Sequence, residues 1–217
     1  IVDLGRMDRI LEVNEQLAYA IIEPGVTQGQ LFDHLRTKYI KLWMDCTGAG
    51  REASIIGNAL ERGFGHTPYS DHFAQLGALE VVLGSGRVVK TGMGRFPGSR
   101  SACVYPYGVG PALDGLFAQS SFGIVTQAAV WLMPEPECFC AFFVRCADEG
   151  ELAGVVDGLA DLRRRGVIQA AIHFGNDWRV AAARMPYPWS RAGGETPLPA
   201  GLREEIRGEL GIGRWNV

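Results

Sequence analysis

The residues that could do chemistry gather in one stretch, SIIGNALERGFGHTPYSDH, at positions 54–72. Its three glycines are Gly57, Gly63 and Gly65. Because glycine has no side chain, backbone N–H groups there can approach a flat or anionic ligand closely. Asn58 and Thr67 add side chains that form hydrogen bonds. Taken alone, these residues fit a ligand-binding loop and a long surface loop equally well.

The spacing in this stretch excludes a Rossmann dinucleotide motif, because no G-x-G-x-x-G lies at a strand-to-helix turn. The five cysteines contain no C-x-x-C pair, so we predict neither a metal site nor a redox pair. Cys138 and Cys140 should share one face of a strand with small apolar neighbours. Reduced, mostly buried thiols would suit a reducing compartment, and we expect a cytoplasmic protein.

Composition narrows the class of protein further. The chain has 217 residues, is 47% hydrophobic and 21% charged, and has a net charge of −3, which is ordinary for a globular protein. No basic stretch is dense enough to indicate nucleic acid. No apolar stretch has the roughly 18 residues of a membrane helix. The chain starts without methionine and ends within a strand-like run, so we interpret both ends as interruptions.

The elements that must position the glycine-rich stretch are predicted on both sides of it. Upstream, Ile10–Val13 and Ala18–Ile22 form an expected hairpin. Thr27 is placed to cap a helix that continues to Thr37 and presents Leu31, Phe32 and Leu35 on one face. Downstream, LEVVLGSGRVVKTG predicts a second hairpin, GPALDGLFAQS a helix, and GIVTQAAVWLMP a strand buried on both faces.

The segment PEPE, at positions 134–137, is the predicted domain boundary, because prolines stiffen it and charge exposes it. Beyond it we expect strands at Phe139–Cys146 and Val167–Phe174, and helices at Glu151–Arg165 and Leu202–Leu210. The order of elements predicts an α+β fold in two parts, residues 1–135 and 136–217.

Residues 54–72 resemble the G-N-x-x-x-R-G-x-G-Y-T-P-Y-G-D-H signature of the vanillyl-alcohol oxidase and 4-cresol dehydrogenase flavoenzymes. The matching residues are Gly57, Asn58, Arg62, Gly63, Gly65, Thr67, Pro68, Tyr69, Asp71 and His72. Three further segments resemble the family in order: LEVNEQLAYAIIEPGVT, EVVLGSGRVVKTGMG and PYGVGPALDGLFAQSSFGIVTQAAVWLMP. The resemblance covers residues 1–135 almost continuously, and four ordered motifs make it specific.

The resemblance implies a flavoprotein with FAD as its cofactor. It implies that residues 1–135 are the second half of a p-cresol methylhydroxylase-type FAD-binding domain, a mixed sheet with flanking helices. Residues 136–217 would begin an α+β substrate (cap) domain. The flavin ring would lie along the glycine-rich loop and its nucleotide half near residues 123–125. The implied cofactor-binding residues are Ser54, Ile55, Gly57, Asn58, Gly63, Gly65, Thr67, Tyr69, Gly123, Ile124 and Val125.

Two departures from the family pattern concern catalysis. His66 stands where the family commonly has a tyrosine that helps to hold a substrate phenolate. It is a candidate catalytic residue, with a solvent-facing loop residue as the alternative. The phenol-oxidising members carry P-D-L-G-G-G-S before the signature, whereas this chain has TGAGREAS. Glu52 is the candidate substitute for the missing carboxylate, and a surface role for it is the alternative.

The function implied is oxidation of a small aromatic alcohol or alkyl phenol by hydride transfer to flavin. Its partners would be a small-molecule substrate and either a second copy or an electron-acceptor protein. The family's phosphate-binding loop would precede Ile1, so we expect this chain alone to bind FAD weakly or not at all and to be inactive. We also expect residues 54–70 to be exposed or poorly ordered. The alternatives are a non-catalytic remnant or binding module, and an oxidase of 2-hydroxy acids or aldonolactones.

Overall fold

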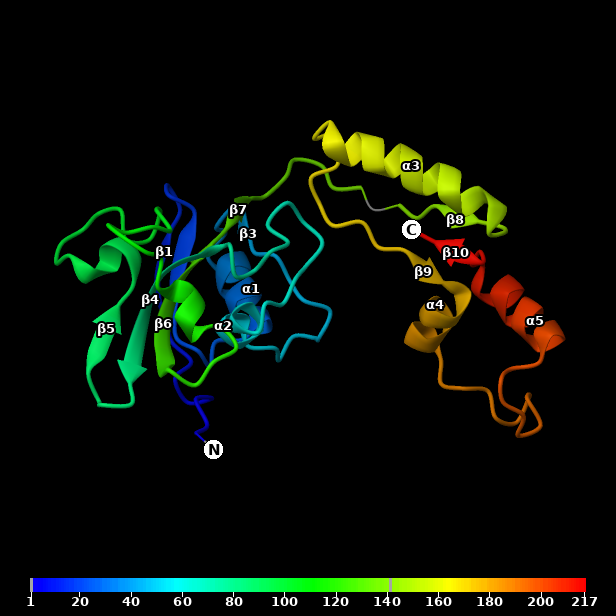
Figure 1. Ribbon diagram of the computed structural model, residues 1–217, viewed down its shortest axis with the longest axis horizontal. Coiled ribbons are helices and arrows are strands. Elements are labelled where there is room, and N and C mark those ends of the chain that lie inside the picture. The colour runs from blue at the N-terminus through cyan, green and yellow to red at the C-terminus, as the bar shows by residue number, and fades with distance from the viewer. Residues whose placement is uncertain (1, 141) are drawn as a thin grey trace. The chain divides into compact units, whose positions relative to one another are not determined.

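The computed structural model describes residues 2–140 and 142–217, which divide into two compact units, Ile1–Glu137 and Cys138–Val217 (Figure 1). Both units combine helices with strands, so the α+β class is confirmed. Within the described residues, no helix is long and apolar enough to cross a membrane.

A five-stranded sheet in the order β1-β2-β6-β4-β5 forms the frame of the first unit. Its strands are β1 Ile10–Asn14, β2 Tyr19–Ile22, β4 Leu76–Leu83, β5 Val88–Lys90 and β6 Gly123–Trp131. Every neighbouring pair in this sheet is antiparallel. Two short strands, β3 Leu42–Trp43 and β7 Met133–Pro134, pair separately. Both predicted hairpins are therefore confirmed, and β6 lies between them in the sheet.

Helix α1, Gln28–Thr37, begins at the predicted cap, since the Thr27 side chain accepts a hydrogen bond from the Gln30 N–H. Leu31 and Leu35 are buried, but Phe32 is 47% exposed. The predicted apolar face was thus wrong for Phe32, whose ring instead lies 5.7 Å from the Arg51 guanidinium.

The core of the first unit lies between one face of the sheet and the helices α1 and α2 (Figure 1). Helix α2, Ile55–Leu60, is a single short helix inside the stretch expected to be loop. Six residues are too few for a stable helix in water. It forms because Ile56 and Ala59 are each 1% exposed and pack into this core.

The expected helix at positions 110–120 is only a 3₁₀ turn, η2 Asp114–Phe117; a second such turn is η1 Gly92–Arg95. Of the apolar residues that favoured the helix, Phe117 is buried while Leu113 and Leu116 are about half exposed.

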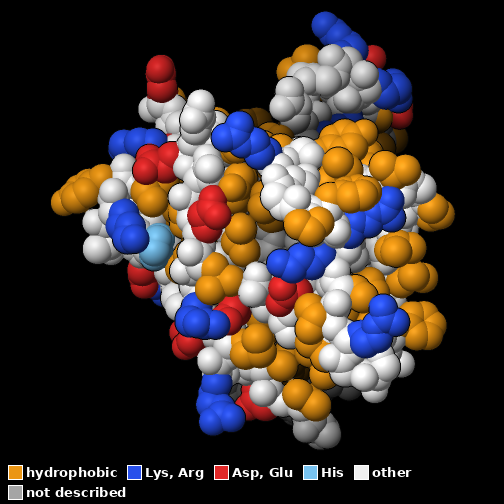
Figure 2. All heavy atoms as spheres, turned by 90° about the vertical axis from the view of Figure 1, so that its left-hand side faces the viewer, with side chains coloured by type: hydrophobic (Ala, Val, Ile, Leu, Met, Phe, Trp, Pro, Cys, Tyr) orange, Lys and Arg blue, Asp and Glu red, His pale blue; other side chains and the backbone are white. Residues whose placement is uncertain are grey.

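Hydrophobic side chains with interspersed basic ones are also visible on the side of the unit that carries β5 (Figure 2).

Among its described residues, the second unit contains three helices and a small sheet in the order β8-β10-β9. Its elements are β8 Arg145–Cys146, α3 Gly150–Arg164, β9 Gly175–Asn176, α4 Asp177–Arg184, α5 Ala200–Leu210 and β10 Trp215–Asn216. Helices α3 and α5 were predicted and α4 was not. The strand predicted at Phe139–Cys146 was too long, because only Arg145 and Cys146 form β8 among its described residues; Ala141 lies outside them. The strand predicted at Val167–Phe174 was wrong, because none of these residues lies in a strand and β9 begins at Gly175.

The cysteines differ from expectation. Cys46, Cys138 and Cys140 are exposed, Cys103 is partly buried and only Cys146 is buried, all as free thiols. Cys138 and Cys140 lie outside any strand, so the predicted apolar strand face is wrong. Period-two alternation was a weak signal here because no neighbouring strand pairs with this segment.

Candidate functional site

An open groove of about 700 Å³ lies in the first unit, at the start of α2 and beside the beginning of β6. Five of the predicted cofactor residues line it: Ser54, Gly57, Gly123, Ile124 and Val125. These residues are far apart in the sequence, and the fold brings them to one surface. We call this feature the α2–β6 groove.

Local hydrogen bonds position the α2 side of the groove. The Ser54 hydroxyl donates to the Pro24 carbonyl at 2.6 Å and accepts from the Gly57 N–H at 2.9 Å. It therefore ties the start of α2 to the turn after β2 and caps the helix. Gly57 is exposed toward the groove, and a Cβ there would meet only the Ser54 side chain.

The β6 side is positioned by the sheet. Gly123 pairs with Leu83 across the β4–β6 ladder, and a Cβ on Gly123 would crowd the Val81 side chain. Glycine is therefore needed here for packing on β4. Val125 is buried and Ile124 is 38% exposed, as the alternation of a strand requires, and both contribute to the groove lining.

The charged residues that line the α2–β6 groove are Asp3, Glu52 and Glu61, and no Lys or Arg is among them. A lining of glycine, apolar side chains and hydroxyls suits a flat, uncharged ring or a sugar. Acidic neighbours are unfavourable for a diphosphate. The groove thus fits the neutral parts of a flavin nucleotide and lacks what its diphosphate needs.

A second cluster of predicted residues lies around the Asp45 carboxylate, whose side chain is 5% exposed. It accepts from the N–H groups of Cys46 at 2.7 Å, His66 at 3.3 Å and Thr67 at 3.3 Å, and from the Thr67 hydroxyl at 2.9 Å. Burial pushes the pKa of Asp45 upward, but the nearby His72 ring and the hydrogen bonds from Thr67 and Cys46 outweigh it and lower this pKa. Asp45 is therefore an ionised anchor for the loop.

His72 completes this cluster. Its Nδ1 lies 2.6 Å from the Asn58 Oδ1, so Nδ1 carries the donated proton. Its Nε2 lies 3.8 Å from the Asp45 Oδ2, which is too long for a direct hydrogen bond, and is buried with no hydrogen-bond partner in the described chain. An adjoining cavity of about 20 Å³, lined by both residues, has room for one bridging water.

The glycines of the loop make room for these side chains. A Cβ on Gly63 would overlap the Asn58 amide, and one on Gly65 would overlap the Asp45 carboxylate. Among the other predicted residues, Ile55, Asn58 and Tyr69 line the small cavity and Thr67 bonds to Asp45. The loop expected to be poorly ordered is thus held by internal hydrogen bonds, with Gly65 itself buried.

The two candidate catalytic residues are in different surroundings. Glu52 is exposed and lines the α2–β6 groove. His66 is exposed, packs edge-on against Phe64 at 6.1 Å between ring centroids, and is not among the lining residues of the groove. The structure does not bring these two side chains into one pocket.

Several groove residues were not predicted. They lie near the start of the chain, around the turn after β2, on or next to α2, and before β6: Val2, Asp3, Leu4, Gly5, Pro24, Gly25, Thr27, Ile56, Leu60, Glu61, Phe117, Gln119 and Ser120. The Pro-Gly turn after β2 could have been recognised in the sequence as part of the site, because a turn at this place brings the chain back toward α1. Asp45 and His72 were not named as site residues either, since only the folded loop shows what they hold.

The chain is similar to known proteins over almost its whole length. Residues 1–92 match the FAD binding domain family. The chain is 40% identical over 215 residues to 1'-carboxy-chondrochloren decarboxylase of Chondromyces crocatus, covering 99% of this chain and 40% of that protein. It is 34% identical over 219 residues to the 4-cresol dehydrogenase [hydroxylating] flavoprotein subunit of Pseudomonas putida, covering 100% of this chain and 42% of that protein.

The solved structure of p-cresol methylhydroxylase with substrate bound matches with a TM-score of 0.91 at 34% identity, covering 100% of this chain and 42% of that one. These matches place the chain in the class of flavoproteins. The chain is homologous to the FAD-binding oxidases related to 4-cresol dehydrogenase, and FAD is the cofactor of that family. It spans about two fifths of the length of these relatives, 40% and 42%.

Proposed function

We propose that this chain forms one side of the FAD site of an oxidoreductase that oxidises a small aromatic alcohol or alkyl phenol. The observation that carries the proposal is the α2–β6 groove, which gathers Ser54 and Gly57 with residues 123–125. The first unit would be the second half of the FAD-binding domain, and the second unit the beginning of the substrate domain.

In this proposal the groove holds the uncharged parts of the cofactor. The exposed Gly57 backbone and the Ile124 side chain offer a surface against which a flat group can lie. When bound, FAD supplies the acceptor for a hydride from the substrate carbon. The Asp45 cluster fixes the shape of the adjoining loop, which keeps the groove pre-formed and lowers the ordering cost of binding.

Glu52 is the proposed proton acceptor. Its carboxylate is exposed on the groove, and a carboxylate can take the proton that a substrate hydroxyl loses as its carbon gives up a hydride. His66 is proposed as a separate candidate to donate a hydrogen bond to the substrate oxygen, because it stands where the family commonly has a tyrosine; it does not line the groove. An electron-acceptor protein is the proposed partner, since the Pseudomonas putida relative is named as a subunit.

A second candidate is oxidation of a substrate that carries a carboxylate. The relative from Chondromyces crocatus, 40% identical, is named a decarboxylase, and the phenol-holding tyrosine is replaced by His66. A substrate screen that pairs each alkyl phenol with its carboxylated analogue would separate the two candidates. Turnover of the carboxylated member alone would favour the second.

Gly57→Ala tests the groove. A Cβ at Gly57 meets only Ser54, at 3.0 Å from Oγ, so it should change the free energy of unfolding by only about 1 kcal/mol. It would still project where the flat group should lie. We expect FAD affinity of the full gene product, followed by flavin fluorescence, to fall about tenfold or more. Gly158→Ala in α3, where a Cβ meets nothing within 4 Å, is the control. Unchanged affinity in Gly57→Ala would overturn the assigned groove.

A further inference from the structure

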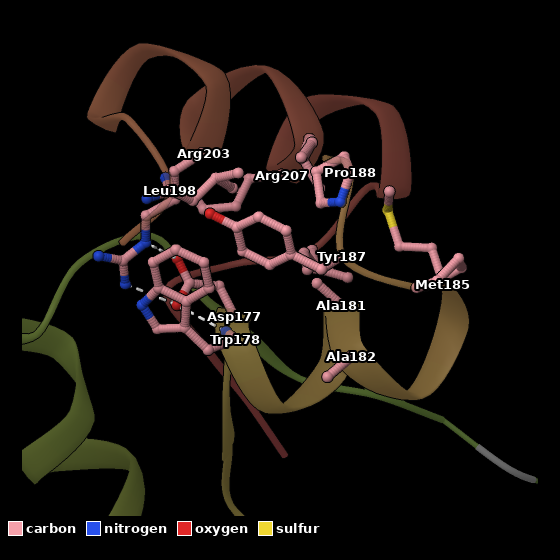
Figure 3. A pocket seen from close by; sticks show the side chains of 13 residues that line it. Asp177, Trp178, Ala181, Ala182, Met185, Tyr187, Pro188, Leu198, Arg203 and Arg207 are labelled. Carbon is pink, nitrogen blue, oxygen red and sulfur yellow. Dashed lines mark hydrogen bonds and ion pairs between the residues drawn. The ribbon is translucent and has the colours of Figure 1, made fainter. Parts of the chain in front are cut away.

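A separate pocket of about 220 Å³ lies within the second unit, between α4 and α5 (Figure 3). Figure 3 shows side chains from both helices and from the segment around Tyr187 converging on it. Its apolar walls include Trp178, Ala181, Met185, Tyr187, Leu198 and Ile206. Leu198 and Ile206 are also buried in the core of this unit, so packing holds their side chains in place.

The pocket also contains three charged residues, and their pairing is unequal. Asp177 accepts from the Arg203 Nε and Nη2 at 2.7 Å each, a bidentate pair that compensates both charges. The Arg203 guanidinium lies 4.6 Å from the Trp178 ring centroid, which fixes it further. This pair therefore offers little to a ligand.

Arg207 is the exception. Its Nη1 donates to Glu204 at 2.9 Å, but its Nε is buried and has no hydrogen-bond partner in the described part of the chain. Glu204 is exposed and does not line the pocket. The pocket lining thus contains two arginines and one aspartate, so positive charge is in excess there. Arg207 lines the pocket, and among the described residues its guanidinium forms an ion pair only with the exposed Glu204, so an anion in the pocket would be attracted to its guanidinium.

We propose that this pocket binds a small aromatic carboxylate, with its ring against the apolar walls and its carboxylate on Arg207. Size supports one ring: a cavity of about 150 Å³ lined by apolar residues accepts benzene, so 220 Å³ admits a ring with one polar substituent. The residues involved all belong to the second unit and share none with the α2–β6 groove. The inference therefore stands independently of FAD.

The test uses benzoate and, as the neutral probe of similar shape, benzyl alcohol. Both are titrated into the 217-residue chain, with ¹H–¹⁵N spectra following the Trp178 indole and the Leu198 and Ile206 amides. We expect benzoate to shift these signals and to bind more tightly than benzyl alcohol. Arg207→Met should weaken benzoate by roughly tenfold to a hundredfold, the worth of one charge-assisted hydrogen bond, and leave benzyl alcohol unchanged.

Arg214→Met is the matched control, because Arg214 also pairs with Glu204, at 3.8 Å, but does not line the pocket. It should keep benzoate affinity. Ala181→Leu, which fills the pocket and retains Arg207, should abolish binding of both probes and covers the case in which Arg207→Met fails to fold. The proposal is overturned if benzoate shifts none of these signals, binds no better than benzyl alcohol, or binds equally well to Ala181→Leu.

Discussion

The His72 ring holds the Asn58 side chain, with Nδ1 2.6 Å from Oδ1, and Gly63 leaves the space that the Asn58 amide fills. This relationship links the end of α2 to the far side of the loop, 14 residues later. It gives a packing reason for the residue types at Asn58, Gly63 and His72. It also makes the loop a folded structure with its own internal contacts.

Gly63→Ala should destabilise the first unit by about 1–3 kcal/mol, because the new methyl group overlaps the Asn58 amide and breaks its contact with His72. Urea unfolding followed by circular dichroism measures the change. Gly154→Ala in α3, where nothing lies within 4 Å, provides the comparison and should be neutral or stabilising. Equal stability of the two variants would show that the loop does not depend on this contact.

Asp45→Asn should cost about 1–3 kcal/mol of unfolding free energy at neutral pH, because the N–H groups of His66 and Thr67 lose their charged acceptor. The pKa of Asp45 is lowered in the folded state. Its stabilisation is therefore full above the unfolded value of about 3.9 and is lost as pH falls through the folded pKa. The difference between wild type and variant should stay constant from about pH 5 to 7 and shrink below about pH 4. A difference that grows on acidification would contradict this assignment.

Asp177→Asn should destabilise the second unit by about 3–5 kcal/mol, because it leaves the Arg203 guanidinium without its buried counter-charge. The Asp177 side chain is 3% exposed, and the pKa of Asp177 is lowered because the bonds from Arg203 outweigh the opposing effect of burial. Asp161→Asn removes an exposed pair with Arg164 and Arg165 and should change stability by less than about 1 kcal/mol. Thermal unfolding of both variants tests this difference in stability. Equal melting temperatures would contradict the assigned role of Asp177.

The 217-residue chain should be purified colourless and bind FAD weakly or not at all. Its groove carries three acids and no base, so nothing in that lining offsets the two negative charges of the diphosphate. Association alone costs about 4–15 kcal/mol. Titration of FAD with detection by flavin fluorescence measures this, with riboflavin as the comparison that lacks a diphosphate. Submicromolar FAD binding, or a yellow preparation, would show that the site is more complete than we propose.

Glu52→Gln in the FAD-loaded full gene product should lower kcat by about 10²–10⁴-fold if this carboxylate accepts the substrate proton. The loss should come with a changed pH profile of kcat, while FAD affinity stays the same. His66→Ala should raise KM more than it lowers kcat, since a hydrogen bond to the substrate oxygen also acts in the ground state. Glu61→Gln, also on the groove, serves as control. Equal activity of Glu52→Gln and wild type would exclude the assigned role.

The local elements could be predicted because their signals are local. The two hairpins, the Thr27 cap and the helices α3 and α5 each depend on residues within a few positions of one another. The ordered motifs likewise identified the flavoprotein family and its cofactor FAD, because a motif is recognised by comparing one sequence with another and needs no coordinates. The short helix α2 was missed because its stability comes from burial of Ile56 and Ala59 against distant strands.

The sequence by itself determined the class of fold and the flavoprotein family, and it predicted some of the residues that line the groove. Only the tertiary structure decided which residues face the groove and which face one another. Ser54 and Gly57 meet residues 123–125 across the groove, whereas Gly63, Gly65 and Thr67 surround Asp45 and Asn58 inside the loop. Glycine serves close approach to a ligand and close approach to a neighbouring side chain equally well. The spacing of glycines cannot distinguish these two uses, because the surroundings of each glycine are formed by residues that are distant in the sequence.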